Sequence, residues 1–291
     1  MWWRTPVSLR PSNDLAIAPV EFPEQAEDAP VRATGVWELT GTGAGFGGFS
    51  ALLLRGNRIA AFSDRGWRLS FSLPDRDPDF ETAQVLPERR LRQVLFDIEG
   101  ATLAADGRTY WLSYEGRPTI QRFDSRHAAD GARRLKGMHW AANGGLEAMT
   151  RLSDGAFLIL TESAREAYLF AGDPVEGARL TAVPVRWPVA EFVPTDAAQL
   201  PDGRVLVLMR RFTMGLPNEW RSLLAVADAP QAGEPWEPQV LADLEGILPP
   251  ENYEGLAVRS TAGGSTEIWL ISDNNFSAFQ RTLLARLVLG D

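Results

Sequence analysis

The sequence predicts an all-β protein, a β-propeller, and three observations carry this prediction. Five segments of similar layout follow one another along the 291-residue chain. Each segment holds a glycine-containing turn and then an apolar run of four or five residues. No amphipathic pattern long enough for a helix of about ten residues interrupts them. Repeats of this length, each with room for about four short strands, are typical of propeller blades.

The five repeats share a turn followed by a buried strand. They are GGFSALLLRGNRIAAFSDRG from Gly47, DIEGATLAADGRTYWLSYEG from Asp97, GGLEAMTRLSDGAFLILTES from Gly144, PTDAAQLPDGRVLVLMRRF from Pro194 and NYEGLAVRSTAGGSTEIWLISDNN from Asn252. The turn pairs are Gly56-Asn57, Asp106-Gly107, Asp154-Gly155, Asp202-Gly203 and Gly263-Gly264. Such pairs supply the positive φ that tight hairpins need. The runs after them are rich in β-branched and aromatic residues, which favours buried strands.

The spacing of the repeats favours five blades. The first polar residues, Ser50, Glu99, Glu147, Asp196 and Glu254, lie 49, 48, 49 and 58 positions apart. Strand-like stretches such as RPTIQRF and RSLLAVA supply outer strands. We expect VRATGVWEL, residues 31–39, to close the last blade together with the C-terminal strands. Residues 1–30 are then an N-terminal extension, and residues 31–291 form one domain. A sixth blade would have to come from residues 1–30.

Composition excludes several classes of function. The net charge of -9 argues against a nonspecific nucleic-acid binder. The absence of cysteine excludes disulfides, thiolate zinc sites and a cysteine nucleophile. No apolar run approaches the ~20 residues that span a bilayer, so we expect no membrane insertion. The start, MWWRTPVSLRPSND, shows no apolar core of a signal peptide. Nothing in the composition predicts the oligomeric state.

Acidic residues recur at two positions of the repeat. The innermost strand of every blade faces the central channel, so residues at one repeat position face a common axis. Ser50, Glu99, Glu147, Asp196 and Glu254 form one expected ring, and Asp64, Glu115, Glu162, Arg210 and Asp273 form a second. Two carboxylates ~6 Å apart repel by about 3 kcal/mol at an effective dielectric near 20. Protons, arginines or a cation must compensate, and an oxygen-only ligand set favours Ca²⁺ over zinc.

Arginines accompany these acids. Arg65, Arg117 and Arg165 follow acidic positions, and Arg210 and Arg211 stand where other repeats carry an acid. Guanidinium groups match phosphate geometry, so acids and arginines together could hold a cation and a phosphate. The alternative is structural: the acids accept backbone hydrogen bonds, and the arginines only neutralise them.

Three other motifs are set aside. GAGFGG, residues 43–48, fits the dinucleotide pattern, but no helix follows it. GFSAL around Ser50 lacks the second glycine of a nucleophile elbow, and neither His127 nor His139 suits a triad. DRDPDFE, residues 75–81, lacks the glycine and glutamate of a calcium-binding loop. We expect the ten tryptophans to pack between blades, with Trp67 as a candidate pocket wall.

From Gly47 to Leu289 the motifs resemble a bacterial family called esterase-like activity of phytase, or phytase-like. The motifs that carry the resemblance are GGFSALLL…FSDRG, DIEGATLAADGRTYWLSYEG, NGGLEAMTRLSDGAFLILTE, TDAAQLPDGRVLVLMRRF and NYEGLAV…IWLISDNNF. The resemblance implies a propeller related to the β-propeller phytases, which use calcium to hydrolyse phosphate esters. The acidic motif residues fall on Glu99, Glu147, Asp196, Glu254 and Asp273. The tract LVLMRRF departs from the pattern, because Arg210 stands where an acid is expected.

Two functions follow as expectations. In the first, the chain is a calcium-dependent phosphoric-ester hydrolase that acts on a small phosphorylated or anionic substrate. The expected metal ligands are Glu99, Glu147, Asp196, Glu254, Asp273, Asp64 and Glu115, and the expected catalytic residues are Glu162, Arg65, Arg210 and Arg211. In the second, a noncatalytic propeller binds a small ligand or protein at the channel mouth. The resemblance also favours export to the periplasm.

Overall fold

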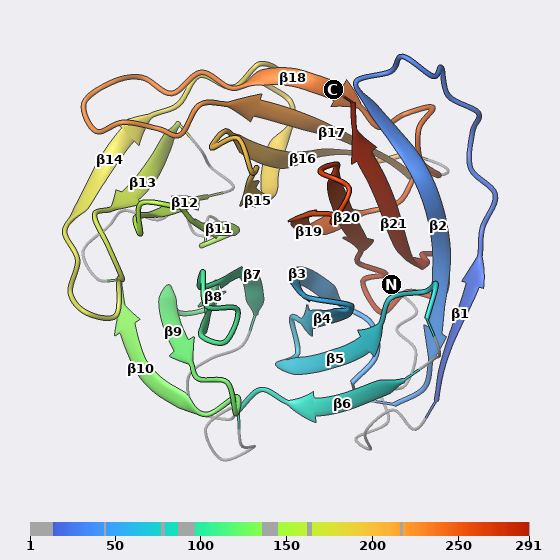
Figure 1. Cartoon of the computed structure of the whole chain (residues 1–291), viewed down its shortest axis with the longest axis horizontal. Coiled ribbons are helices and arrows are strands. Elements are labelled where there is room, and N and C mark those ends of the chain that lie inside the picture. Colours follow the sequence, from blue (N-terminus) through green and yellow to red (C-terminus); the bar gives the residue numbers. More distant parts are fainter. Residues whose placement is uncertain are drawn as a thin grey trace.

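The computed structural model describes residues 14–43, 45–76, 79–86, 97–135, 145–161, 165–215 and 218–290. These residues form strands, turns and loops, and none of them is helical. Five antiparallel sheets are arranged around a central axis (Figure 1). The chain is therefore a five-bladed β-propeller, as the sequence predicts. Among the described residues, no helix has the length and apolar character needed to cross a membrane.

The first four blades each contain four strands that run outward in chain order. Blade 1 comprises β3 (Phe49–Arg55), β4 (Arg58–Ser63), β5 (Trp67–Ser72) and β6 (Phe80–Gln84). Blade 2 comprises β7 (Ile98–Leu103), β8 (Tyr110–Tyr114), β9 (Thr119–Phe123) and β10 (Ala129–Arg134). Blade 3 comprises β11 (Ala148–Arg151), β12 (Phe157–Leu160), β13 (Glu166–Phe170) and β14 (Leu180–Pro184). Blade 4 comprises β15 (Val193–Gln199), β16 (Val205–Thr213), β17 (Glu219–Ala227) and β18 (Gln239–Asp243).

Blade 5 joins the two ends of the chain. It contains β19 (Tyr253–Ser260), β20 (Thr266–Ser272) and β21 (Thr282–Leu289), followed outward by β2 (Val31–Gly41) and β1 (Leu15–Pro19). The antiparallel pairing of β2 with β21 places Val36 opposite Ala285. Closure by residues 31–39 is thus confirmed. Strand β1, inside residues 1–30, adds a fifth strand that the sequence analysis did not anticipate, at the outer edge of Figure 1.

The inner strands approach closely around the axis. Each of β3, β7, β11, β15 and β19 contacts the next, and β19 contacts β3, so the ring is complete. Small residues permit this approach. A Cβ at Gly100 would lie 2.7 Å from Ser113 Oγ and 3.0 Å from the backbone nitrogen of Met149 in the next blade. The tight hairpins also form as expected, with φ of +66° at Gly107 and +90° at Gly155.

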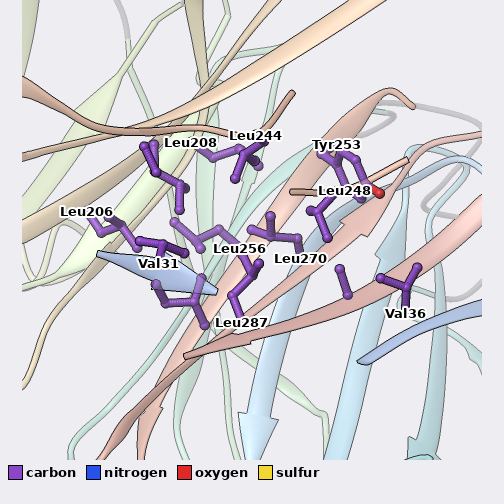
Figure 2. Packing of buried hydrophobic residues seen from close by; sticks show 14 of the residues in the cluster. Val31, Val36, Leu206, Leu208, Leu244, Leu248, Tyr253, Leu256, Leu270 and Leu287 are labelled. Carbon is purple, nitrogen blue, oxygen red and sulfur yellow. The ribbon is translucent and has the colours of Figure 1, made fainter. Parts of the chain in front are cut away.

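Apolar side chains fill the spaces between neighbouring blades. Figure 2 shows the cluster between blades 4 and 5, where Leu206 and Leu208 of β16 meet Leu256 and Leu270 of β19 and β20. Val31 of β2 packs into the same cluster. The N-terminal strand is therefore part of the core that blade 5 shares with its neighbours.

Leu39 tests the contribution of this closure. Its side chain on β2 is 1% exposed and packs with residues of blades 1 and 5. We expect Leu39→Ala to lower the free energy of unfolding by about 2–5 kcal/mol, since a buried leucine is lost and a cavity remains. Denaturant unfolding measures the change. Val240→Ala is the control, because that side chain is 46% exposed; equal losses in the two variants would contradict a closing role for β2.

Candidate functional site

The inner strands change register where their acidic residues stand. In β3, β7, β15 and β19 the pairing with the second strand shifts by one residue, as a β-bulge does. The extra residues are Ser50, Glu99, Thr195 and Glu254. Glu147 holds the matching place just before β11, where its N–H donates to Leu160 O at 3.1 Å. A bulge leaves one residue out of the ladder and redirects its side chain. The repeated position is therefore a repeated backbone feature.

Thr195, and not Asp196, occupies this position in blade 4. The Thr195 hydroxyl lies 3.4 Å from Leu208 O and 3.5 Å from Tyr253 O. Asp196 is fully buried, and its two carboxylate oxygens accept backbone hydrogen bonds from Ala197 N at 2.8 Å and Leu256 N at 2.7 Å. Asp196 thus links β15 to β19, which is the structural alternative for the repeated acids.

Seven carboxylates gather at one mouth of the channel, and we call them the acidic cluster. Its members are Asp64, Asp97, Glu99, Glu115, Glu147, Glu254 and Asp273. Asp64 comes from blade 1, Asp97, Glu99 and Glu115 from blade 2, Glu147 from blade 3, and the last two from blade 5. Apart from Asp97, every member belongs to the two rings that the sequence predicts. Four of the five blades therefore direct carboxylates to one place.

Within the acidic cluster, Asp97, Glu99 and Glu115 are closest to one another. One carboxylate oxygen from each lies within 4.8 Å of the others, a spacing that a single metal ion can bridge. Among the described residues, no other group of acidic or histidine side chains meets this criterion. Gly145 of blade 3 donates its N–H to Glu115 Oε1 at 3.3 Å and helps to orient that side chain.

Mutual repulsion and burial disturb the titration of the acidic cluster. Burial raises the pKa of Asp64 to about 7, and the charge of Asp97 adds to the rise. Burial and the charge of Glu147 hold the pKa of Glu99 well above its usual range. Burial and the charge of Glu254 do the same to the pKa of Asp273. Carboxyls in this arrangement take up protons or attract a cation.

In blades 2 and 5, a backbone hydrogen bond links the residue of the second ring to the residue that precedes the inner strand. Asp97 O accepts from Glu115 N at 2.9 Å, and Asn252 O accepts from Asp273 N at 2.8 Å. Asp97 and Asn252 both precede a glutamate by two residues, in the tracts DIEG and NYEG. The sequence analysis passed over both residues, although this pattern of a polar residue, any residue, glutamate and glycine could have found them. Asp97 has a φ of +73°, which an aspartate tolerates better than most residues.

Two arginines border the acidic cluster. Arg210 of β16 forms an ion pair with Glu254 and donates to Asn252 Oδ1 at 2.5 Å. The guanidinium carbon of Arg65, in the β4–β5 turn, lies 3.2 Å from the ring centre of Phe276. The charge of Arg65 lowers the pKa of Asp64 against the effect of burial. Both predicted arginines are thus beside the predicted acids, close to blade 5.

The loop after β20 completes this side of the mouth. Asn274 Oδ1 accepts from Gly48 N at 3.2 Å and from Phe276 N at 3.1 Å. Asn275 and Phe276 both have positive φ, 48° and 50°, and a bulky residue in this region signals backbone strain. A Cβ at Gly48 would lie 2.5 Å from Asp64 Oδ1 and 2.4 Å from the Phe276 ring. Only glycine fits under this loop.

Other predicted site residues lie elsewhere. Arg211 points to the opposite face of β16 from Arg210, as successive strand residues do, and pairs with Glu191 at 2.9 Å. The Ser50 hydroxyl donates to Ile98 O and is buried. Trp67 is buried in β5. Glu162 and His139 lie outside the described residues.

A separate cavity of about 260 Å³ lies at the other end of the channel. It is lined by the later residues of the inner strands, including Leu54, Leu103 and Val258, together with Arg151 and Gln199. None of the seven carboxylates lines it. The chemistry of the channel is therefore concentrated at the acidic mouth.

The fold and this site define a class: a β-propeller with a carboxylate-rich centre at one channel mouth. The model of the Phytase-like family, described as esterase-like activity of phytase, matches residues 44–276. The chain belongs to this family, as its motifs predict. A comparison with curated proteins finds no match.

Several solved structures are similar to the chain at low sequence identity. Glutaminyl cyclase from Myxococcus xanthus is 15% identical, with a TM-score of 0.50 over 84% of this chain and 92% of that one. A luciferin-regenerating enzyme is 9% identical, with a TM-score of 0.49 over 96% and 98% of the two chains. Virginiamycin B lyase from Staphylococcus aureus is 10% identical, with a TM-score of 0.46 over 95% and 100%. At such identities the first likeness shows the fold alone.

Asp196→Asn separates structural from ligand roles. An amide oxygen cannot replace both carboxylate acceptors, so we expect the variant to lose about 1–3 kcal/mol of unfolding free energy. Its calcium affinity, measured by titration calorimetry on folded protein, should equal that of the wild type. A variant of full stability but weakened calcium binding would show that Asp196 is a ligand after all.

Protein freed of divalent cations should lose stability as the pH rises towards neutrality. The folded-state pKa of Asp64, about 7, lies above its ordinary value of 3.8. Between these two values the folded state holds a proton that the unfolded chain has released, so its stability falls with pH and levels off above about 7. We expect the melting temperature in EDTA to fall between about pH 4 and pH 7, and to fall less in Asp64→Asn. A melting temperature that rises over this range would contradict the assignment.

Proposed function

We propose that the chain is a calcium-dependent phosphoric-ester hydrolase that acts at the acidic cluster. The observation that carries the proposal is the group formed by Asp97, Glu99 and Glu115, whose oxygens lie within 4.8 Å of one another. Membership of the Phytase-like family supports it. The arginines beside blade 5 supply the positive groups that an anionic substrate requires.

The donor set suits calcium. All the side chains are hard oxygen donors, which Ca²⁺ prefers, and Ca²⁺ accepts six to eight such ligands in flexible geometry. Asp97, Glu99 and Glu115 would hold the ion, with Glu147 and Glu254 within electrostatic reach of Glu99. The ion would neutralise carboxylates whose burial and crowding otherwise favour protonation. Asp64 and Asp273 add to the negative potential at the proposed calcium site, because their charges act on other members of the acidic cluster. The negative charge that attracts the ion therefore comes from four blades.

In this proposal the acidic residues bind the cation and the arginines bind the phosphate group. A bound calcium ion would polarise the phosphoryl group and lower the pKa of a water molecule. Arg65 and Arg210 would bind the nonbridging phosphate oxygens, and Glu254 orients Arg210 through their ion pair. Asp64 interacts through its charge with Arg65 and Asp97, and Asp273 does so with Arg210 and Glu254, so either could accept a proton beside the substrate. Glu162 was expected as the base and remains a prediction, as does export to the periplasm.

Phosphate release tests the proposal. Purified protein is incubated with phytate and with an aryl phosphate, in calcium and in EDTA. We expect release in calcium, loss in EDTA and recovery when calcium is restored. Protein that binds calcium by calorimetry yet releases no phosphate from either ester would reject the hydrolase.

Glu99→Gln should lower phosphate release by at least tenfold and weaken calcium binding. The amide removes one charge from the group of three oxygens, and a charge-assisted contact is worth roughly 1.5–3 kcal/mol. Glu267→Gln is the matched control, because Glu267 is similarly shielded but pairs with Arg259 at 2.7 Å on blade 5, outside the acidic cluster. Equal loss in both variants would indicate general destabilisation.

Arg65→Gln addresses substrate binding separately. We expect it to raise KM for the aryl phosphate about tenfold while leaving calcium affinity unchanged, since one guanidinium contact to phosphate is lost. Steady-state kinetics measures the change, with calorimetry of calcium binding as the control. An unchanged KM would remove Arg65 from the substrate site.

The second candidate is a noncatalytic propeller that binds a small ligand. The cavity of about 260 Å³ at the opposite mouth favours it, because its lining combines apolar side chains with polar ones such as Arg151, Ser153 and Gln199. Pockets of this character bind ligands without chemistry. Calcium binding without phosphate release would favour this candidate.

A further inference from the structure

A second group of arginines lies between blades 1 and 2, apart from the acidic cluster. Arg55, Arg58 and Arg68 of blade 1 line a cavity of about 190 Å³, which Tyr110 and His127 of blade 2 border from the other side. One water molecule takes ~30 Å³ of liquid, so the cavity has room for a larger group. In a chain of net charge -9, three guanidinium groups around one cavity require an explanation.

The most buried of these arginines has unused donors. Arg68 is 5% exposed, and its Nη2 donates to Glu81 at 3.1 Å. Within the part of the chain that the structure describes, its Nε and Nη1 make no hydrogen bond of normal geometry, and neither does Nε of Arg55. The Tyr110 hydroxyl is the polar group that interacts with the Arg68 guanidinium from blade 2. Buried donors without partners are costly and uncommon in folded proteins. A small anion with several acceptor oxygens would satisfy them.

Three arginines and one carboxylate, that of Glu81, line this cavity. Arg68 pairs with Glu81, whose side chain is well exposed, and Arg55 donates to the backbone oxygen of Arg108 at 3.0 Å. Asp79, which pairs with Arg58, and Asp106 and Asp124, which act on Arg55 and His127 through their charge, do not line the cavity. Guanidinium forks match the geometry of phosphate oxygens, which a monatomic anion such as chloride does not offer.

We propose that this cavity between blades 1 and 2 binds a phosphate group, either free phosphate or the phosphoryl end of a small monoester, through Arg68 and Arg55. His127 lies at its border and forms a hydrogen bond with the Tyr110 hydroxyl through Nδ1, at 3.1 Å. The site is separate from the acidic cluster and independent of the proposed hydrolase activity. It uses only residues of the first two blades.

His127 reports on the charge state of this cavity. Burial, together with the charges of Arg68 and Arg55, lowers the pKa of His127 to about 4 against the opposing charges of Glu81 and Asp124. Burial also raises the pKa of Tyr110 to about 12, so its hydroxyl stays protonated at neutral pH. A bound phosphate would offset the arginine charges and raise the pKa of His127. The chain has two histidines, so the ring signals are simple to assign with His139→Gln.

The experiment is a titration of calcium-free protein with inorganic phosphate at constant ionic strength, followed by NMR of the histidine rings. We expect a saturable shift of the His127 signal and an upward move of its titration midpoint. Arg68→Gln and Arg55→Gln should each weaken phosphate affinity at least tenfold, and Arg221→Gln, an arginine paired with Asp243 on blade 4, should leave it unchanged. Should Arg68→Gln fail to fold, Arg55→Gln decides.

Two further arms fix the ligand. Glycerol phosphate producing the same saturable shift would extend the site to monoesters, and failure of glycerol phosphate alone would restrict it to free phosphate. No saturable shift with inorganic phosphate, an equal shift with acetate, or full affinity in both arginine variants would overturn the proposal. Glu99→Gln should retain the His127 response, so failure of the hydrolase hypothesis would not affect this result.

Discussion

Repulsion among carboxylates that converge on the propeller axis is the constraint around which the acidic mouth is built. Burial and like charges together raise the pKa values of Asp64, Glu99 and Asp273. Such an arrangement persists only if the surrounding structure fixes it. The compact backbone at Gly48 and the left-handed residues Asp97 and Phe276 are the signs of that fixation. Protons, the arginines or a cation must supply the balancing charge.

A repeated β-bulge directs the repeated acidic residues of the inner strands to the channel mouth. The register shift at Glu99 and Glu254 removes these residues from the ladder just where the inner strands begin. The following residues, Gly100 and Gly255, are small because the next inner strand passes close to them. A glutamate followed by a glycine therefore marks both a carboxylate at the channel mouth and a position where the next inner strand leaves no room for a side chain. At the opposite end of the same strands pairing is regular, and no carboxylate of the acidic cluster lines the cavity there.

Much of the fold and of the acidic cluster could be predicted from the sequence. The repeats, the turn glycines and the N-terminal closing strand predicted the ring, because periodicity and turn chemistry are local properties. The acidic cluster was predicted except for Asp97. Asp196 and Arg211 show the limit of that reasoning: one residue of displacement reverses the direction of a strand side chain. Alignment by residue type favoured Asp196 over Thr195, and only the observed register shows that Thr195 holds the position. Contacts between blades, such as Arg68 beside His127, lie beyond any local pattern.

The blades are similar in fold but differ in charge, and this difference makes the charge distribution around the acidic mouth asymmetric. Blade 2 supplies Asp97, Glu99 and Glu115, the tightest group of carboxylates among the described residues. Blade 5 is not adjacent to blade 2 in the ring, and at blade 5 Arg210 meets Glu254 and Arg65 lies over Phe276. A perfectly repeated acid would create a symmetric negative ring with no place for an anion. Replacing acids by Ser50 and Thr195 in blades 1 and 4, and bringing Arg65 and Arg210 from those same blades, separates a negative side from a mixed one. The proposed phosphate-ester substrate would need that separation, because its charged oxygens and an activating cation would occupy neighbouring but distinct positions.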